Sequence, residues 1–499
     1  EARYLPVRSG RVSDEDAAAF AAALRELPGP AVAYCRSGTR SATLWSLASA
    51  ARLPVAEILA ATRAAGYDMS GVVRRIANGG RTPTDRADAR HEVVIVGGGA
   101  AGISVAASLR ARRPGLDVAI IDPSDVHYYQ PGWTMVGGGV FDAEDTARTM
   151  GSLIPRGVHW IKAAVAAFEP QDNAVILDGC RVVQYDRLIV CPGLKLDWHA
   201  VAGLPETLGR NGVTSNYRYD LAPYTWKLVR ELRGGRALFT QPPMPIKCAG
   251  APQKAMYLSA DHWRDRGTLD AIDIEFHTAG AVLFGVREYV PALERYIQRY
   301  GTDVRFRSNL VAVDGPAGRA WFDVTDDDGA VTRVERSFDL LHVCPPQTAP
   351  DFIRVSPLAD EAGWVDVDRA TLRHARHANI WALGDVTNAP NAKTAAAARK
   401  QAPVVAENLV ADLEGESPRV QYDGYGSCPL TVERGRVVLA EFGYGGVLLP
   451  SFPNWLVDGR RPSRLAWLLK ERLLPPIYWK AMLRGREWLA RPERVSAEP

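Results

Sequence analysis

Cys248 occupies a position in the chain that favours a reactive thiolate. It lies in the stretch 245–254 (Pro-Ile-Lys-Cys-Ala-Gly-Ala-Pro-Gln-Lys), between a predicted strand at 236–240 and a helix that we expect to begin near Pro252. Proline is tolerated in a first helical turn because its missing N–H would have no partner there. The N–H groups at the helix start and the neighbouring Lys247 would lower the pKa of the thiol. The stretch therefore predicts a reactive cysteine, although a buried cysteine that caps a helix would have the same sequence.

A second cysteine, Cys35, opens a loop of small residues between a predicted buried strand at 31–34 and a predicted helix at 42–51. A strand, a small-residue loop and a helix together form a nest of backbone N–H groups that binds anions. Cys35 would lie at its centre as a thiolate, with Arg36 and Arg40 as counter-charges. The loop therefore predicts a second thiol-based site.

This loop resembles that of rhodanese-type sulfurtransferases and cysteine phosphatases. Four residues separate Cys35 from Arg40, which is the rhodanese count, whereas phosphatases have one more. Residues 1–78 as a whole resemble the small rhodanese- or phosphatase-like domain that is fused to sulfur-metabolising enzymes. A capping box that begins at Ser13 predicts a helix to about Leu27. We favour sulfur transfer by Cys35 over phosphate hydrolysis, with an inert loop as the third interpretation.

The composition is that of a soluble globular protein with room for about three domains. A net charge of +3 is too small to indicate a nucleic-acid partner. There is no secretory signal and no apolar run of the roughly 18 residues needed to span a bilayer. Six cysteines without a CxxC pair indicate neither a disulfide scaffold nor a metal site, so any paired cysteines are expected to be catalytic. The chain enters its first domain after the expected first strand and helix, so we expect an N-terminal part before residue 1.

A dinucleotide fingerprint follows this first domain. The predicted strand 92–96 leads into Gly-Gly-Gly-Ala-Ala-Gly at 97–102 and then into a helix that runs to Arg113. A second strand at 117–121 ends at Asp122, the position of an acid that binds a ribose hydroxyl. The pyrophosphate would lie at the helix start. The candidate cofactor contacts here are Gly97, Gly99, Ala100, Ala101, Gly102 and Asp122.

Two further segments favour FAD over NAD. The stretch 379–385 is a strand that ends in Gly-Asp, and a helix begins at 393–397. In flavoproteins with two dinucleotide domains, such an aspartate reaches the ribityl chain and the helix start points at the flavin. Residues 185–193 resemble their returning strand, although Cys191 departs from the usual Ala-Thr-Gly and is interpreted as a packed residue. The candidate FAD contacts in these segments are Gly193, Gly384, Asp385, Lys393 and Thr394.

Residues 235–345 predict a second βαβ region that lacks a nicotinamide site. Its first turn, 241–245, reads Gln-Pro-Pro-Met-Pro, and prolines offer no N–H to a pyrophosphate. The next strand ends at 277–280 (His-Thr-Ala-Gly) without an acid for the ribose. We therefore expect a reductant other than NAD(P)H. The expected elements are strands at 236–240, 272–277 and 304–313, with helices after Ala251 and near 291–300.

Residues 91 to about 490 resemble sulfide:quinone oxidoreductases, in particular the group that includes the mitochondrial enzyme. The resemblance implies that Cys248 and Cys428 form a redox-active disulfide beside FAD and that Gln130 lies near the cofactor. The shared strings are 128–131 (Tyr-Tyr-Gln-Pro), 247–254, 363–368 (Gly-Trp-Val-Asp-Val-Asp), 393–397 (Lys-Thr-Ala-Ala-Ala), 422–425 (Tyr-Asp-Gly-Tyr) and 427–430 (Ser-Cys-Pro-Leu).

The resemblance also implies a reaction. Hydrosulfide attacks the disulfide, Cys428 keeps the added sulfur as a persulfide, and Cys248 passes two electrons to the flavin through an adduct. A ubiquinone-type quinone then takes the electrons. A second nucleophile removes the outer sulfur, and sulfide, sulfite, cyanide and a thiol such as glutathione are all open. Cys344 is interpreted as a packed residue, with a third redox cysteine as the alternative, and Cys180 has no evident role.

The segment 461–489 predicts contact with a membrane surface. It contains two short apolar stretches, which we expect to be helices broken at Pro475 and Pro476, with basic residues and tryptophans between them. Such segments are typical of helices that lie in the interface of a membrane, and they are too short to span the bilayer. The same residues would also suit helices packed on the core of the protein. We expect a peripheral, monotopic protein on the cytoplasmic face of a bacterial inner membrane. Assembly into a homo-oligomer stays open.

The expected fold is α/β, with two dinucleotide-binding, Rossmann-like domains of the disulfide-reductase flavoprotein type behind a small, truncated α/β domain. Two other functions stay open: an NADH:quinone dehydrogenase, and a redox sensor whose disulfide controls a partner without turnover. The expected units are 1–78 (rhodanese/phosphatase-like), 79–90 (linker), 91–205 with 345–430 (FAD-binding), 206–344 (second Rossmann-like domain) and 431–499 (membrane-interface segment).

Overall fold

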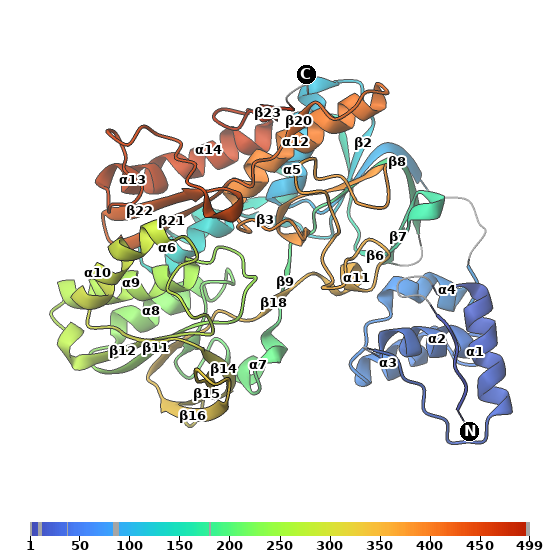
Figure 1. Ribbon diagram of the computed structural model, residues 1–499, viewed down its shortest axis with the longest axis horizontal. Helices are drawn as coiled ribbons and strands as arrows, with labels where there is room; N and C mark the ends of the chain where they lie inside the picture. Colours follow the sequence, from blue (N-terminus) through green and yellow to red (C-terminus); the bar gives the residue numbers. More distant parts are fainter. Residues whose placement is uncertain (1, 8–11, 37, 83–88, 179–180, 496–499) are drawn as a thin grey trace.

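The computed structural model describes residues 2–7, 12–36, 38–82, 89–178 and 181–495 (Figure 1). Part of the predicted linker and Cys180 lie outside these residues. A helical N-terminal region stands beside two sheet-containing regions, and the C-terminal helices run along the upper side of both in this view (Figure 1).

The described N-terminal region is a small helical unit. The predicted capping box is present at the start of α1 (Asp14–Glu26): the Ser13 hydroxyl accepts from the Asp16 N–H at 3.0 Å, and the Asp16 carboxylate accepts from the Ser13 N–H at 2.8 Å. Leu47, Ile58 and Ile76 are buried between the helices. The other helices are α2 (Thr39–Ser49), α3 (Val55–Ala64) and α4 (Val73–Ala77).

The prediction of a buried strand at 31–34 is wrong. The segment carries no strand pairing, and the side chains of Val32 and Tyr34 are 86% and 89% exposed. A strand needs a neighbour that satisfies its N–H and C=O groups, and no strand occurs in the described part of residues 2–82. This short apolar run therefore has no neighbouring strand to pair with among the described residues of this region.

The N-terminal region contacts the next domain through η1 (Ser70–Val72) and β6 (Val165–Glu169). Arg74 pairs with Glu169 at 3.6 Å. A Cβ on Gly71 would lie 2.9 Å from the carbonyl oxygen of Ala166, so only glycine permits this approach. The contact fixes this region against the edge of the first large sheet.

That first sheet has the order β5-β2-β1-β8-β7-β6, and β19 also pairs with β8. Strands β1, β2, β5, β8 and β19 are parallel. Buried valine and isoleucine predominate in β2 and in the second half of β1, as expected for strands covered on both faces, whereas the edge strand β5 is only partly buried. Helix α5 (Ala100–Arg112) packs against α12 (Ala395–Leu413). The strands are β1 (Ala89–Val96), β2 (Val118–Ile121), β5 (Val158–Ile161), β7 (Ala174–Leu177), β8 (Val182–Val190) and β19 (Ile380–Ala382).

The second sheet is parallel throughout and has the order β10-β17-β11-β12-β13. The strand predicted at 304–313 is divided by Arg307, whose positive φ of 49° interrupts extended backbone. Its second part belongs to an antiparallel sheet of β14, β15 and β16. The elements are β10 (Val213–Thr214), β11 (Gly235–Gln241), β12 (Ile272–Thr278), β13 (Asp303–Arg305), β14 (Ser308–Asp314), β15 (Arg319–Thr325), β16 (Val331–Ser337) and β17 (Leu340–His342), with α8 (Ala222–Glu231), α9 (Ala251–Asp265) and α10 (Val290–Arg299).

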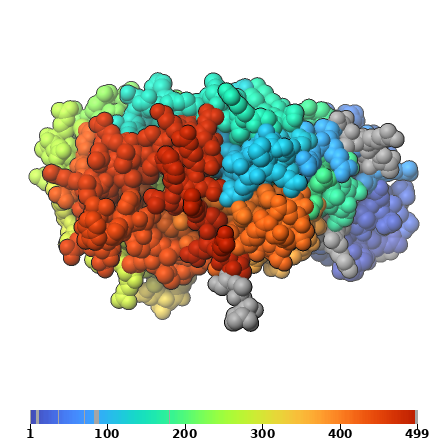
Figure 2. Space-filling view, turned by 90° about the horizontal axis from the view of Figure 1, so that it is seen from above, coloured from blue at the N-terminus to red at the C-terminus, as the bar shows by residue number. Residues whose placement is uncertain are grey.

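A C-terminal hairpin of β21 (Gly426–Glu433) and β22 (Arg436–Phe442) packs against α9. The expected boundary between 430 and 431 therefore falls inside β21. After the hairpin come α13 (Arg464–Leu468), a π-helical turn η12 (Leu469–Leu473), α14 (Leu474–Lys480) and η13 (Met482–Arg484). This C-terminal segment covers much of the face seen in Figure 2.

The prediction that the C-terminal helix breaks at its prolines is wrong. Residues 464–480 form one uninterrupted helical run, and the prolines occupy the first turn of α14. The wider turn of η12 precedes them and relieves the loss of their N–H donors. No helix in the described ranges has both the length and the apolar character to cross a bilayer.

Candidate active site

The backbone at Cys248 is held in an uncommon conformation. Its φ is +51°, which a non-glycine residue adopts only when its surroundings impose it. The Cys248 N–H donates to the carbonyl of Lys393 at 2.9 Å, and its own carbonyl accepts from the Ala251 N–H at 2.7 Å. These bonds fix Cys248 just before α9, in the loop where the sequence placed it.

The side chains of Cys248 and Cys428 meet. Cys428 lies within β21, opposite Ala440 of β22, and is buried. The two Sγ atoms are 3.4 Å apart and both thiols are free. A disulfide has an S–S length of about 2.05 Å, so a small displacement would join them. A Cβ on Gly250 would lie 2.7 Å from the Cys428 sulfur, which shows how closely the loop and strand approach.

The charge around the two sulfurs is asymmetric. The hydrogen bond from Cys428 and the charge of Lys254, whose Nζ lies 3.0 Å from the Cys248 sulfur, hold the pKa of Cys248 well below its usual range. The same hydrogen bond, together with burial, raises the pKa of Cys428. In the reduced pair, Cys248 is therefore the thiolate and Cys428 the thiol.

The cation beside the thiolate differs from the one expected. Lys254 lies in the first turn of α9, where side chains lean toward the helix start, and so reaches back to Cys248. Lys247 was the sequence-based choice, but its Nζ donates to Gln130 and lies 5.3 Å from the Trp133 ring and 5.5 Å from the Tyr217 ring. Its own pKa is lowered to about 8 by burial. Lys254 stands six residues after Cys248 in the sequence, but no sequence pattern showed that its side chain points toward the Cys248 sulfur.

Lys470 is a second buried lysine near the thiol pair, and the sequence did not reveal it. It lies on η12, and its Nζ donates to the carbonyl of Pro429 at 2.9 Å and to the Thr431 hydroxyl. Burial and the repulsion of Lys254 lower its pKa well below that of an ordinary lysine. It joins the C-terminal helical run to the strand that carries Cys428, and no local pattern indicates that contact.

The glycine turn after β1 fits a dinucleotide. Gly97 has a φ of +106°, and a Cβ there would lie 2.6 Å from the carbonyl of Cys191, while a Cβ on Gly102 would lie 1.8 Å from the carbonyl of Gly97. Gly99 has open space at the Cβ position, and no side chain caps the N-terminus of α5 behind it. This turn therefore offers free N–H groups and room for a pyrophosphate.

Of the other candidate cofactor contacts, Asp122 and Gly384 adjoin this turn, and a Cβ on Gly384 would lie 3.2 Å from the Cβ of Ala101. The Asp122 carboxylate accepts from the Gly98 N–H at 2.6 Å, directly beside the turn. Burial raises the pKa of Asp385. Lys393 donates to the carbonyls of Asp385 and Thr387 at 2.8 and 2.7 Å, and Thr394 caps α12. Gly193 has a φ of +76° and open space at its Cβ position.

Two other cysteines are packed. Cys191 is buried, its sulfur points to the carbonyl of Gly97 at 3.6 Å, and burial raises its pKa. Cys344 is buried in a cluster with Tyr217 and Ile246 that Cys248 also contacts, and burial raises its pKa to about 12. Neither thiol has the cation that accompanies Cys248.

The loop of Cys35 lies in the N-terminal region, and the helix that follows it, α2, lies apart from α9 and β21 in Figure 1. Arg40 donates to the carbonyl of Val7 at 2.7 Å, and Arg36 is exposed. Ser37 lies outside the described residues. The loop and the Cys248–Cys428 pair thus belong to separate parts of the protein.

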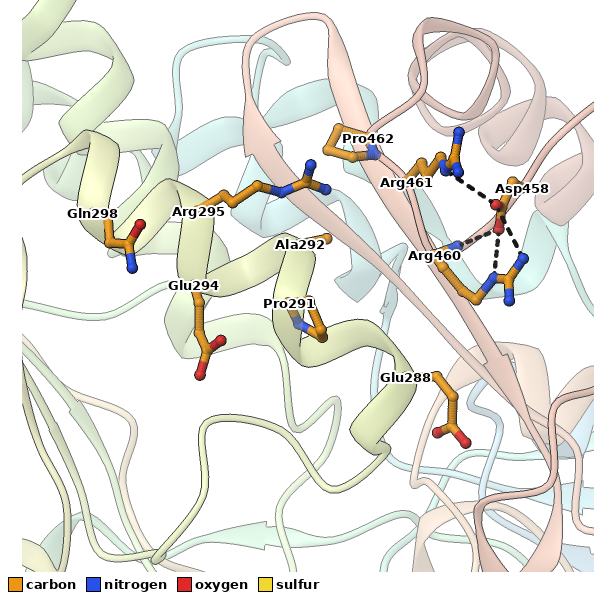
Figure 3. Close-up of a pocket in the computed structure, with 10 residues that line it drawn as sticks. All are labelled: Glu288, Pro291, Ala292, Glu294, Arg295, Gln298, Asp458, Arg460, Arg461 and Pro462. Carbon is orange, nitrogen blue, oxygen red and sulfur yellow. Dashed lines mark hydrogen bonds and ion pairs between the residues drawn. The ribbon is translucent and has the colours of Figure 1, made fainter.

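Another cavity, of about 800 Å³, lies elsewhere, between α10 and residues 458–462 (Figure 3). Arg460 and Arg461 turn toward Asp458, at 2.9 and 3.4 Å, and partly neutralise it. No cysteine lines this cavity, so it is not the thiol site.

Comparison with known proteins defines the family. The profile of pyridine nucleotide-disulphide oxidoreductases matches residues 91–240. The chain is 41% identical over 399 residues to "Sulfide:quinone oxidoreductase, mitochondrial" of Dictyostelium discoideum, covering 79% of this chain and 86% of that one. This protein belongs to the sulfide:quinone oxidoreductase family. The mitochondrial relative of Mus musculus is 40% identical over 79% of this chain and 87% of its own.

The sulfide:quinone oxidoreductase of Aquifex aeolicus has the same fold, with a TM-score of 0.65 at 20% identity over 79% of this chain and 92% of that one. This likeness confirms the α/β fold of the disulfide-reductase flavoproteins, and the mitochondrial relatives confirm the enzyme class expected from the resemblance. The protein is an FAD-type sulfide:quinone oxidoreductase. The profile of the phosphatase-like domain of beta-lactamase hydrolase-like proteins matches residues 2–52, so the N-terminal region is phosphatase-like.

Proposed function

We propose that the Cys248–Cys428 pair is the site where this sulfide:quinone oxidoreductase takes electrons from sulfide. The observation that carries the proposal is the 3.4 Å separation of the two sulfurs with the Lys254 Nζ 3.0 Å from that of Cys248. A disulfide reacts at the sulfur whose partner leaves more readily, and the lower-pKa thiol leaves faster. The asymmetric charge therefore directs hydrosulfide to Cys428.

The reaction begins with the pair oxidised. Hydrosulfide attacks Sγ of Cys428, the S–S bond breaks, and Cys248 leaves as a thiolate that Lys254 stabilises. Cys428 then carries the added sulfur as a persulfide. A second nucleophile, such as sulfide, sulfite, cyanide or glutathione, removes that outer sulfur and frees Cys428 to close the disulfide again as two electrons leave the pair.

FAD, when bound, supplies the two-electron acceptor between this pair and a ubiquinone-type quinone. The open turn at Gly97–Gly102 would hold its pyrophosphate and Asp122 its ribose. Asp385 and the start of α12 would lie toward the flavin end, on the Lys393 side of Cys248. Gln130 is held by Lys247 near the same end.

The N-terminal region is proposed to handle the sulfur that the flavoprotein releases. Cys35 would accept sulfane sulfur from a persulfide such as that of glutathione, or donate it onward to sulfite, with Arg36 and Arg40 nearby in sequence. The four-residue spacing from Cys35 to Arg40 supports sulfur transfer. The phosphatase-like match supports the alternative of phosphate hydrolysis.

The C-terminal segment is proposed to rest on a membrane surface, where a lipid-soluble quinone is found. Its exposed apolar side chains support this contact. The curated relatives named above are mitochondrial, so the comparisons give no support to a bacterial inner membrane. The exposed side chains are Leu465, Leu468, Leu473, Trp488 and Leu489.

An anaerobic titration of the holoenzyme tests the thiol mechanism. Sulfide is expected to bleach the flavin, and a soluble ubiquinone analogue to restore its absorbance with repeated turnover. NADH is expected to leave the flavin oxidised, because Pro242 and Pro243 replace the glycine turn after β11. Rapid bleaching by NADH would indicate an NADH:quinone dehydrogenase, and bleaching by sulfide without turnover would indicate a redox sensor.

A further inference from the structure

A basic cavity of about 670 Å³ lies beside the C-terminal helices and has no role in the proposed thiol chemistry. Its wall contains no acidic side chain. One cation comes from β4 (Ala147–Thr149), and the others come from the end of α14 and the residues after it. The lining residues are Arg148, Ser152, Leu153, Trp479, Lys480, Arg484 and Arg486.

The four cations of this wall are not neutralised by carboxylates. Within the part of the chain that the structure describes, no ion pair forms at Arg148, Lys480, Arg484 or Arg486. The cavity beside α10 differs, because Asp458 pairs with its arginines there (Figure 3). Four like charges around one cavity repel one another, so an anion between them is favoured.

Two of the arginines are held in place. Arg148 lies over the Trp479 ring at 5.1 Å and donates to the carbonyl of Ala147 at 2.6 Å. Arg484 donates to the carbonyl of Ser152 at 3.1 Å. These contacts leave the guanidinium groups charged and only partly hydrogen-bonded. Planar guanidinium groups bind phosphate with paired N–H donors.

The surroundings indicate a lipid as the source of the phosphate. Trp488 and Leu489, which follow Arg486 closely, are 62% and 67% exposed, and Leu473 before α14 is 49% exposed. Arg148, Ser152 and Leu153 line the cavity opposite the end of α14, and the C-terminal segment covers much of the face seen in Figure 2. A phospholipid would place its phosphate among the cations of the cavity and its acyl chains against these exposed apolar side chains.

We propose that this cavity binds the phosphate headgroup of an anionic phospholipid. The proposal rests on the membrane contact of the C-terminal segment and goes beyond it, because it assigns the preference for anionic lipid to four side chains rather than to general charge. Apolar contact alone would hold the protein on neutral and anionic bilayers equally.

Vesicle co-sedimentation of the full-length holoenzyme tests the proposal. Vesicles of phosphatidylcholine are compared with vesicles in which about a fifth of the lipid is phosphatidylglycerol, near physiological salt, where the screening length is about 8 Å. The pocket variant is Lys480→Ser with Arg486→Ser. The matched control is Arg464→Ser with Arg472→Ser, which removes the same charge from exposed positions of the same helical run outside the cavity.

Wild type and control are expected to bind the anionic vesicles about tenfold more tightly than the neutral ones, and the pocket variant is expected to lose that preference. Equal losses in both variants would overturn the pocket in favour of diffuse attraction. Failure of wild type to bind either vesicle would overturn the membrane contact itself, while soluble-quinone turnover still reports an intact enzyme. Specific binding of inorganic phosphate without vesicles, followed by phosphorus NMR and lost in the pocket variant, would overturn the lipid as ligand in favour of a soluble phosphate.

Discussion

The Nζ atom of Lys254 lies 3.0 Å from the sulfur of Cys248, and the thiol of Cys428 lies 3.4 Å from that same sulfur. Two chemically identical side chains are thereby made different: one is a stabilised thiolate, the other a protonated thiol. The difference decides which sulfur leaves and which one keeps the substrate sulfur.

Replacing Lys254 by methionine is expected to raise the pKa of Cys248, because the thiolate loses its cation. The thiolate fraction at neutral pH then falls, and turnover with sulfide falls by about a hundredfold, the usual cost of one charge-stabilising donor. Activity is expected to recover as pH rises through the higher pKa. The pH profile of quinone reduction and the alkylation rate of the reduced enzyme measure the shift.

Lys254→Arg is the control for this prediction, since it keeps the charge. An unchanged pH profile in Lys254→Met would mean that the hydrogen bond from Cys428 alone lowers the pKa of Cys248.

Cys248→Ser and Cys428→Ser are each expected to abolish sulfide-dependent quinone reduction, because neither variant can form the disulfide that sulfide attacks. Stopped-flow reduction of the flavin and steady-state quinone assays measure the loss. Cys344→Ser is the matched control: its thiol is buried in the adjoining cluster, so its turnover should persist. Ordinary turnover in Cys248→Ser or Cys428→Ser would remove the thiol mechanism.

Gly250→Ala is expected to separate the two sulfurs. The new Cβ would lie 2.3 Å from the Leu430 side chain and 2.7 Å from the sulfur of Cys428, so these buried side chains must move away from the loop, at a cost of about 1–3 kcal/mol. Slower disulfide formation, followed by thiol counting after oxidation, and slower quinone reduction should result. Gly285→Ala is the control, because a Cβ there meets nothing within 4 Å. A wild-type number of free thiols after oxidation of Gly250→Ala would show that the surrounding side chains accommodate the methyl group without separating the two sulfurs.

Cys35→Ser is expected to spare quinone reduction, since α2 lies apart from the thiol pair, and to end thiosulfate:thiol sulfur transfer. Parallel assays of both reactions on the same preparation measure the separation. Hydrolysis of an aryl phosphate that depends on Cys35, with no sulfur transfer, would assign the domain to phosphate chemistry instead.

The dinucleotide turn and its strands could be predicted because their signals are local. Glycines at 97–102, the buried strand before them and Asp122 after the next strand occupy one continuous βαβ unit. Cys248 could be placed before α9 for the same reason, from Pro252 in the first helical turn. The pairing with Cys428 came from family resemblance, because a contact between a loop and a distant strand leaves no periodic pattern.

The failures have physical causes outside the local sequence. The segment 31–34 has the residues of a strand, but a strand also needs a partner, and the described N-terminal region has none. Lys247 and Lys254 flank Cys248 in sequence, and only the lean of side chains along α9 decides that Lys254 faces the sulfur. Pro475 and Pro476 suggested a break, but the π-helical turn before them keeps the run continuous.

The uninterrupted helical run at 464–480 also supports the interior of the enzyme. Lys470 donates to the carbonyl next to Cys428, and the hydroxyl of Tyr478 lies 2.6 Å from His127, whose other ring nitrogen lies 3.1 Å from the carbonyl of Gly98. The helical run 464–480 thus supports both β21, which carries Cys428, and the glycine turn after β1. Truncating the chain before residue 464 to obtain a more soluble protein would remove these contacts along with the exposed apolar side chains of the segment.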